Sequence, residues 1–261
     1  MSKKFQLRFD LLVVLGIIVA AIPLVVYFQV RFLTSTFFFF IIPSVYLLIR
    51  KAKRIKRILL ASFLFGVLFT FPFDFLAEFN NAWRWPAKEN LLFPYLIFGI
   101  VPVDVMIWYF FWTFSIFVFY EHFFEHDRSD KISPHFKFAL YPILAASAGL
   151  FILFAINPNI LKFTYAYLLL GLVALLPFLF IIRREPAFLP KFLKVNLFFI
   201  FLYVSFELTS LKLNHWHFPG QYIGTVNLLG FRFPFEELFF WILMSSTVVL
   251  SYYKFFVDNE K

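Results

Sequence analysis

Long apolar segments follow one another along the whole chain, and they constrain the fold more than any other feature of the sequence. Each is close to, or longer than, the roughly 20 residues that a helix needs to cross a bilayer. Inside a bilayer every backbone polar group needs an internal partner, which favours helices. We predict eight spans, at about 9–30, 32–49, 58–79, 92–120, 136–156, 163–182, 192–211 and 233–257. The chain is therefore predicted to be an all-α integral membrane protein.

An internal repeat adds a second constraint. The sequence FDFLAEFNNAWRWP at 73–86 returns 133 positions later as FELTSLKLNHWHFP, and VPVDVMIWY at 101–109 returns 132 positions later as FPFEELFFW. A single residue was therefore lost or gained between the two blocks. A period this long indicates gene duplication rather than a solenoid. Four spans per half is an even number, so we predict two direct repeats, 1–130 and 131–261, that face each other around a pseudo-twofold axis.

The basic residues predict the orientation. A net charge of +9 would suit a nucleic-acid partner, but 18 of the 24 Lys and Arg residues lie in the N-terminal tail, in alternate loops and at the C-terminus. In membrane proteins this bias marks the cytoplasmic side. We predict a multi-pass protein of the cell membrane with both termini cytoplasmic, and no nucleic-acid partner. The densest basic run, RKAKRIKR at 50–57, is also compatible with docking on anionic lipid.

Five carboxylates of the repeated blocks fall near the outer ends of their spans: Asp74, Asp104, Glu207, Glu236 and Glu237. Ionisable groups inside a membrane are costly and usually face a bundle interior or a cavity. Desolvation and mutual repulsion favour the neutral, protonated form of at least some of them, which could then act as an acid. An alternative stays open: these side chains cap helix N-termini or pair with Arg84 and Arg232 at the interface.

The order of these residues resembles the lycopene cyclase domain family. An acid near the end of one span is followed by a Trp, and then by Pro-x-Glu-Glu and aromatics in the next span, and the whole unit occurs twice. The resemblance covers 73–111 and 206–242, and PFEELFFW at 234–241 is its most specific part. The chain resembles the fused form of the family. It departs where Val105 follows Asp104, and where residues 80–82 and 214–215 replace a glycine before the Trp.

The resemblance implies a cofactor-free isomerase of the intramolecular lyase type that cyclises the linear end group of lycopene or a related carotenoid. Such a redox-neutral reaction needs an acid, a base and a dry aromatic pocket that stabilises a carbocation. We expect Glu236 and Glu237 to form the acid and base centre, with Asp104, Asp74 and Glu207 as partners or proton-path groups. The candidate substrate-binding residues are Trp83, Trp108, Trp112, Trp216, Phe239, Phe240, Trp241, Asn81 and Asn214. Trp83 and Trp216 either anchor the protein at the membrane interface or line a pocket mouth.

The expected partners are a lipophilic carotenoid or isoprenoid substrate and membrane lipid, and other carotenoid enzymes are candidate partners. No cofactor or metal is expected, because dinucleotide and Walker motifs are missing and the chain has no cysteine. His122, Glu125 and His126 match H-x-x-E-H, but we predict a solvated helix end rather than a zinc site. A proton-coupled transporter and a non-catalytic lipid-binding or assembly protein remain the alternative functions.

Overall fold

The computed structural model describes residues 3–50, 54–85, 90–125 and 131–258. Within these ranges, eight helical segments are long and apolar enough to cross a membrane. They are Lys4–Tyr27, Phe32–Arg50, Ile55–Phe79, Val103–Phe123, Phe136–Ile156, Ala166–Arg184, Pro186–Lys212 and Glu237–Val257. Eight such helices agree with the predicted number of spans and indicate a membrane protein.

Several spans consist of more than one element, because short π-helical turns interrupt the α-helices. In chain order the helices are α1 (Lys3–Tyr27), α2 (Phe32–Thr36), η1 (Phe37–Ile41), α3 (Ile42–Arg50), α4 (Ile55–Phe63), η2 (Leu64–Phe69), α5 (Thr70–Phe79), α6 (Val103–Phe123), α7 (Phe136–Ile156), η4 (Pro158–Leu161), α8 (Ala166–Arg184), η5 (Pro186–Phe188), α9 (Leu189–Lys212), η6 (Glu237–Met244), α10 (Ser245–Tyr252) and η7 (Tyr253–Val257). Of these, η1, η2, η6 and η7 are π-helical, and η4 and η5 are 3₁₀ turns.

Two short β-hairpins occupy the predicted starts of the fourth and eighth spans, so both predicted starts were wrong. The strands β1 (Leu96–Ile97) and β2 (Val101–Pro102) pair before α6, and β3 (Thr225–Leu228) and β4 (Phe231–Pro234) pair before η6. The fourth span thus begins at Val103 rather than near 92, and the eighth at Glu237 rather than near 233. Both turns hold a glycine at positive φ, Gly99 at 73° and Gly230 at 87°, a conformation that suits hairpin turns and ends a helix.

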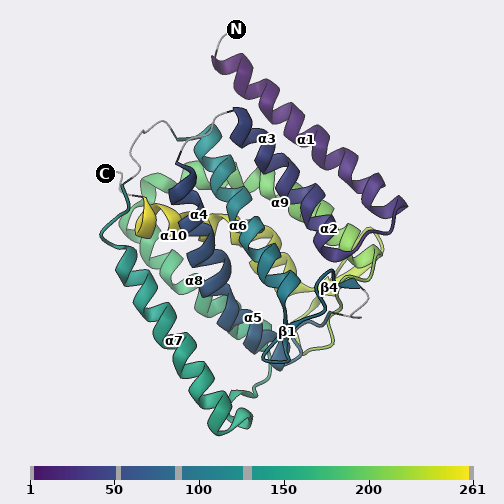
Figure 1. Cartoon of the computed structure of the whole chain (residues 1–261), viewed down its shortest axis with the longest axis vertical. Coiled ribbons are helices and arrows are strands. Elements are labelled where there is room, and N and C mark those ends of the chain that lie inside the picture. Colours follow the sequence, from purple (N-terminus) through teal and green to yellow (C-terminus); the bar gives the residue numbers. More distant parts are fainter. Residues whose placement is uncertain (1–2, 51–53, 86–89, 126–130, 259–261) are drawn as a thin grey trace.

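The centre of the bundle is formed by α6 and the span of η6, α10 and η7. Of their apolar windows, 72% and 67% are buried inside the protein, against 17% for α7 and 22% for α8. The long helices α1 and α7 lie on opposite sides of the bundle (Figure 1). The helix α1 packs on α9, η1 and α3, while α7 packs on α5, η2 and η7. The peripheral helices therefore present most of their apolar surface outward, as lipid-facing helices do.

One end of the bundle holds a buried network of charged side chains, here called the ion-pair end. The Arg57 guanidinium donates to Asp258 Oδ1 at 2.7 Å and to Glu121 Oε1 at 2.8 Å, and Arg54 Nη1 donates to Glu121 Oε2 at 2.6 Å. Lys254 Nζ lies 3.0 Å from Glu125 Oε2. These bonds join α4, α6 and η7, and removing one partner of a buried pair typically costs about 3–5 kcal/mol.

Both described ends of the chain lie at the ion-pair end. In α1, Asp10 accepts bonds from Arg50 Nε at 2.9 Å and Tyr46 OH at 2.8 Å, and its Oδ2 lies 2.9 Å from His122 Nε2. Asp258 belongs to the same end through Arg57. An even number of spans produces this arrangement, and the cytoplasmic placement of this end stays a prediction. Of the H-x-x-E-H motif, His122 and Glu125 take part in these contacts, and His126 lies outside the described residues.

Replacing Gly66 by alanine is expected to destabilise the helix packing. A Cβ there would lie 2.6 Å from the backbone oxygen of Tyr109 and would also collide with Thr113 Oγ1, so α6 would have to move away from η2. Overpacking of this kind costs about 1–3 kcal/mol. Thermal unfolding of the detergent-solubilised protein should show a lower midpoint for Gly66→Ala. Gly149→Ala is the matched control, because a Cβ at Gly149 meets nothing within 4 Å. Equal midpoints for the two variants would contradict this account of the η2–α6 contact.

Candidate functional site

At the other end of the bundle, here called the tryptophan end, each repeated acid holds the repeated tryptophan that follows it. The Trp83 indole Nε1 donates to Asp74 Oδ1 at 3.1 Å, and the Trp216 Nε1 donates to Glu207 Oε1 at 3.0 Å. Both carboxyl groups belong to fully buried residues. Asp74 lies in α5 and Glu207 in α9, about one turn and a half before their helix ends. The chain therefore folds back over each helix end so that the indole reaches the buried acid.

Asparagines make the reversal possible. Asn81 and Asn214 have φ values of 58° and 59°, a left-handed conformation that asparagine tolerates better than most residues and that commonly ends helices. Each is exposed, and neither lines the two cavities described below. The Asn81 Oδ1 accepts from Arg84 Nη2 at 2.6 Å. The structure thus gives these two predicted substrate-binding residues a turn-forming position at the surface.

The two reversing loops pair with each other. Arg84 N donates to His217 O at 2.9 Å, and His217 N donates to Arg84 O at 3.0 Å, so residues 133 positions apart form a reciprocal bridge. Tyr222 OH adds a bond to Ala82 O at 2.7 Å. Residues of both repeated blocks therefore meet around one space.

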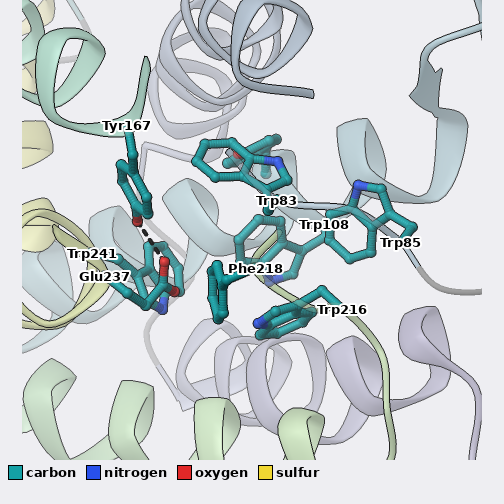
Figure 2. A pocket seen from close by; sticks show the side chains of 9 residues that line it. Trp83, Trp85, Trp108, Tyr167, Trp216, Phe218, Glu237 and Trp241 are labelled. Atoms are coloured by element: carbon teal, nitrogen blue, oxygen red, sulfur yellow. Dashed lines mark hydrogen bonds between the residues drawn. The ribbon is translucent and has the colours of Figure 1, made fainter. Parts of the chain in front are cut away.

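That space is a hollow with an empty volume of about 420 Å³, here called the tryptophan chamber (Figure 2). Its walls are Trp83, Trp85, Trp108, Tyr109, Tyr167, Trp216, Phe218, Glu237 and Trp241. Among these residues Glu237 carries the one carboxyl group, and Figure 2 shows it beside Tyr167 on one flank of the ring of indoles. Trp83 and Trp216, predicted either to anchor the protein at the membrane interface or to line a pocket mouth, both form part of the chamber wall.

The carboxyl group of Glu237 has two close partners. Tyr167 OH in α8 donates to Glu237 Oε2 at 2.5 Å, and Glu207 is near enough to interact with Glu237 electrostatically. The second oxygen of Glu207, Oε2, has no hydrogen-bond partner within the described part of the chain. In that part neither acid accepts a bond from Lys or Arg. Two buried carboxyl groups that face each other without a cation form a candidate acid and base pair.

Asp74 and Glu78 form a second pair of buried acids, of which Glu78 was not predicted from the sequence. Asp74 Oδ1 also accepts from Tyr109 OH at 2.9 Å, and Trp85 Nε1 donates to Glu78, which lies one turn after Asp74 in α5. Glu78 is buried and interacts electrostatically with Asp74. The sequence held one signal for Glu78, its spacing of four residues from Asp74, which puts both on one helix face.

Asp104 and Glu236 lie away from both cavities and hold loops instead. The Asp104 carboxylate accepts the backbone N–H groups of Leu92 at 2.6 Å and Phe93 at 2.9 Å, and Glu236 Oε1 accepts from Ile223 N at 2.8 Å. Both are fully buried, at the starts of α6 and η6. Neither acid caps its helix N-terminus, because these bonds go to loop N–H groups and neither helix start has a side-chain capping bond. Arg84 and Arg232 donate to Asn81 and to Thr225, respectively, and not to these acids.

A larger cavity with an empty volume of about 820 Å³, here called the side slot, lies next to the chamber. The two cavities share Trp83, Tyr109, Tyr167 and Trp241 as walls. Trp112 and Phe240, two predicted substrate-binding residues, line the slot. Trp112 is oriented by a bond from its Nε1 to Tyr203 OH at 2.7 Å. Phe239 lines neither cavity and packs on Phe235 and Phe240.

His215 supports the chamber from outside. It is 2% exposed, its ring packs on Phe32 at 5.9 Å between centroids, and its Nε2 lies 3.0 Å from Val30 O. Burial lowers the pKa of His215 to about 4, although the bond to the Val30 carbonyl acts in the opposite direction. A neutral imidazole with Nε2 protonated satisfies these contacts at neutral pH.

In comparisons with known proteins, no family model, curated sequence or solved structure matches this chain.

Acidification is expected to destabilise the protein through His215. Because the pKa of the folded state lies below the usual value near 6.5, the stabilising neutral form is fully present above pH 6.5 and is lost as the pH falls towards 4. The full difference corresponds to about 3 kcal/mol. Thermal midpoints between pH 7 and 4 should fall less steeply for His215→Gln, which keeps a donor for Val30 and does not titrate. An identical pH dependence in both proteins would contradict a buried neutral imidazole.

Proposed function

We propose that this protein is a membrane carotenoid cyclase, which converts the linear end group of lycopene or a related carotenoid into a ring by acid and base catalysis. The observation that carries the proposal is a carboxyl group, Glu237, that faces a hollow walled by indoles. The resemblance of the repeated blocks to lycopene cyclase domains supports the same reading. The substrate, the reaction and the catalytic roles below all belong to this proposal.

The proposed reaction starts with a proton from the Glu237–Glu207 pair. Transfer to the terminal carbon–carbon double bond leaves a tertiary carbocation, and a nearby double bond of the same chain attacks it to close the ring. The new cation then loses a proton to a carboxylate, which restores the acid. One carbon–carbon single bond forms, one double bond is consumed, and no electrons leave the substrate. Tyr167 holds Glu237 in place through its 2.5 Å bond.

The indoles suit the charged intermediate. Aromatic faces stabilise a cation by about 0.5–2 kcal/mol each, and by more in a dry site. Trp241 lies 5.1 Å from both Trp108 and Trp112 between ring centroids, so the walls near Glu237 are continuous aromatic surface. Asp74 and Glu207 fix the Trp83 and Trp216 rings through the indole N–H groups. We therefore assign these two acids a positioning role, which Glu207 combines with proton sharing.

The proposal includes the two-unit architecture, with 1–130 and 131–261 as direct repeats around a pseudo-twofold axis. Two contacts between residues one repeat period apart support it. Arg84 and His217 form the reciprocal bridge at the tryptophan end, and Tyr253 OH donates to Glu121 at the ion-pair end. An axis through both contacts would relate the two acid–tryptophan pairs.

A proton-coupled transporter is the less favoured alternative. Such a protein needs a path that opens to both sides of the membrane. Here the ion-pair end joins α4, α6 and η7 through buried bonds, and the acids that reach a cavity lie at the tryptophan end. A non-catalytic lipid-binding protein would share the cavities and differ only in the absence of turnover.

Expression in cells that accumulate lycopene tests the proposal directly. Pigment extracts separated by chromatography should contain carotenoids with cyclised ends. Membrane fractions probed for the intact, inserted protein provide the control for expression. Linear pigment alone in the presence of intact protein would count against cyclisation and favour the lipid-binding alternative.

The variants Glu237→Gln and Glu236→Gln should separate the two adjacent acids. We expect Glu237→Gln to lower conversion by about 10²–10⁴-fold, the usual contribution of a general acid. Glu236→Gln should keep most activity, because the amide oxygen still accepts from Ile223 N. Chromatography of pigments, normalised to inserted protein, measures both. The reverse ranking would assign the acid to Glu236 and reject the role given to Glu237.

A further inference from the structure

We propose that the substrate arm enters the tryptophan chamber sideways from the bilayer, through the side slot between α5 and α8. We also propose that, among the described residues, this entrance exists in one half only. This inference rests on the proposed function and deepens it. It identifies the ligand class as an unsubstituted linear isoprenoid chain. It also implies that a substrate with two reactive ends is processed one end at a time.

The position of the slot walls supports lateral entry. One wall comes from η2 and α5, with Phe69 and Phe73, and the other from α8, with Leu170, Gly171 and Ala174. All five residues are partly exposed, and they line a cavity that shares four wall residues with the chamber of Glu237. In a bundle surrounded by lipid, a cavity wall that is also partly exposed on a peripheral helix opens towards the bilayer. A lipophilic molecule would thus reach the acid without crossing water.

The chemistry of the walls selects a hydrocarbon. Three hydroxyl groups in the slot bond to helix backbone: Thr70 Oγ1 donates to Gly66 O at 2.6 Å, Ser245 Oγ to Trp241 O at 2.6 Å, and Tyr252 OH to Ala174 O. The two others, of Tyr109 and Tyr167, donate to the acids at the chamber. The remaining surface is aromatic and aliphatic, with Trp112 and Phe240 among its rings. Flat rings pack well against a conjugated chain, and no Lys, Arg, Asp or Glu of the described residues lines the slot.

The length of the slot fits a chain rather than a compact molecule. Its walls extend along the last span from Trp241 to Tyr252, and Glu237 lies one turn before Trp241. At about 1.5 Å per residue, the distance from Glu237 to Tyr252 along the helix axis is about 22 Å. An extended isoprenoid arm of several units fills such a length with its end group at the carboxyl.

The corresponding opening in the other half is filled. Phe206, the repeat counterpart of Phe73, packs against Phe39 and Phe40 at 5.5 and 5.0 Å between centroids, and all three rings are fully buried. The first-half helix carries four consecutive phenylalanines at 37–40, and Phe39 lies 132 positions before Gly171 of the slot. Large phenylalanine side chains therefore fill the position in the first half, and small residues of α8 leave it open in the second half.

Thiol protection tests occupancy without relying on turnover. The chain has no cysteine, so Ala174→Cys places a single thiol in the slot wall, and Val173→Cys places one on the neighbouring lipid-facing position, which is 53% exposed. In phospholipid nanodiscs, a small lipid-soluble organomercurial should modify both. Lycopene at ten times its dissociation constant should slow the Ala174→Cys reaction about tenfold, in line with the free fraction, and leave Val173→Cys unchanged.

Two outcomes of that experiment would overturn the proposal. Equal slowing at both positions, or at neither, would mean that lycopene does not occupy the slot. Complete protection of the Ala174→Cys thiol before lycopene is added, with no protection of the other thiol, would make the slot a site for a phospholipid acyl chain.

A conversion assay distinguishes failure of this inference from failure of the proposed function. Ala174→Phe fills the slot, and an added ring there should lower conversion of lycopene at least about tenfold through overpacking. Val173→Phe is the matched control and should convert like the unaltered protein. Conversion by all three proteins would reject lateral entry and keep the cyclase. Conversion by none, with selective thiol protection, would reject the cyclase and keep the slot as an isoprenoid site.

Discussion

The bond between an indole N–H and a buried carboxyl group underlies the rest of the tryptophan end. It occurs once in each repeated block, as Trp83 to Asp74 and as Trp216 to Glu207. A carboxyl group without such a donor would be expensive to bury in an apolar helix bundle. The same bond draws the chain back over the helix end and turns the indole into a wall. One contact thus satisfies the buried acid and also places an indole in the chamber wall.

Adjacent acids in this protein serve different purposes because a helix turns by about 100° per residue. Glu236 is directed to the backbone of Ile223, while Glu237 is directed to the chamber and to Tyr167. In the first half Asp104 holds its loop in the same way as Glu236, and Val105 follows it. The departure from paired acids at Val105 therefore leaves loop support in both halves and a chamber carboxyl in one. This asymmetry agrees with the one-sided side slot.

Hydropathy predicted the eight spans because the bilayer sets both the length and the composition of a spanning helix. The hairpins escaped prediction, since their turns at Phe98–Gly99 and Leu229–Gly230 lack the Asn-Gly pattern and their strands are as apolar as the spans. The internal repeat led to the prediction of Glu237 and the tryptophans as site residues. It did not lead to Glu78, Tyr109 or Tyr167. Those three residues differ from their counterparts, and only their contacts in space relate them to the acids.

The reciprocal bridge between Arg84 and His217 has a mechanical consequence. Together with the ion-pair network at the opposite end, it joins residues of the first and second halves of the chain at both ends of the bundle. Rocking one half against the other would break two backbone bonds at one end and several buried ionic contacts at the other. Movement is then easier in the outer helices α7 and α8, which are 17% and 22% buried over their apolar windows. Under the proposed lateral entry, a rigid frame beside a movable outer helix would admit a lipophilic substrate and keep water away from the cationic intermediate.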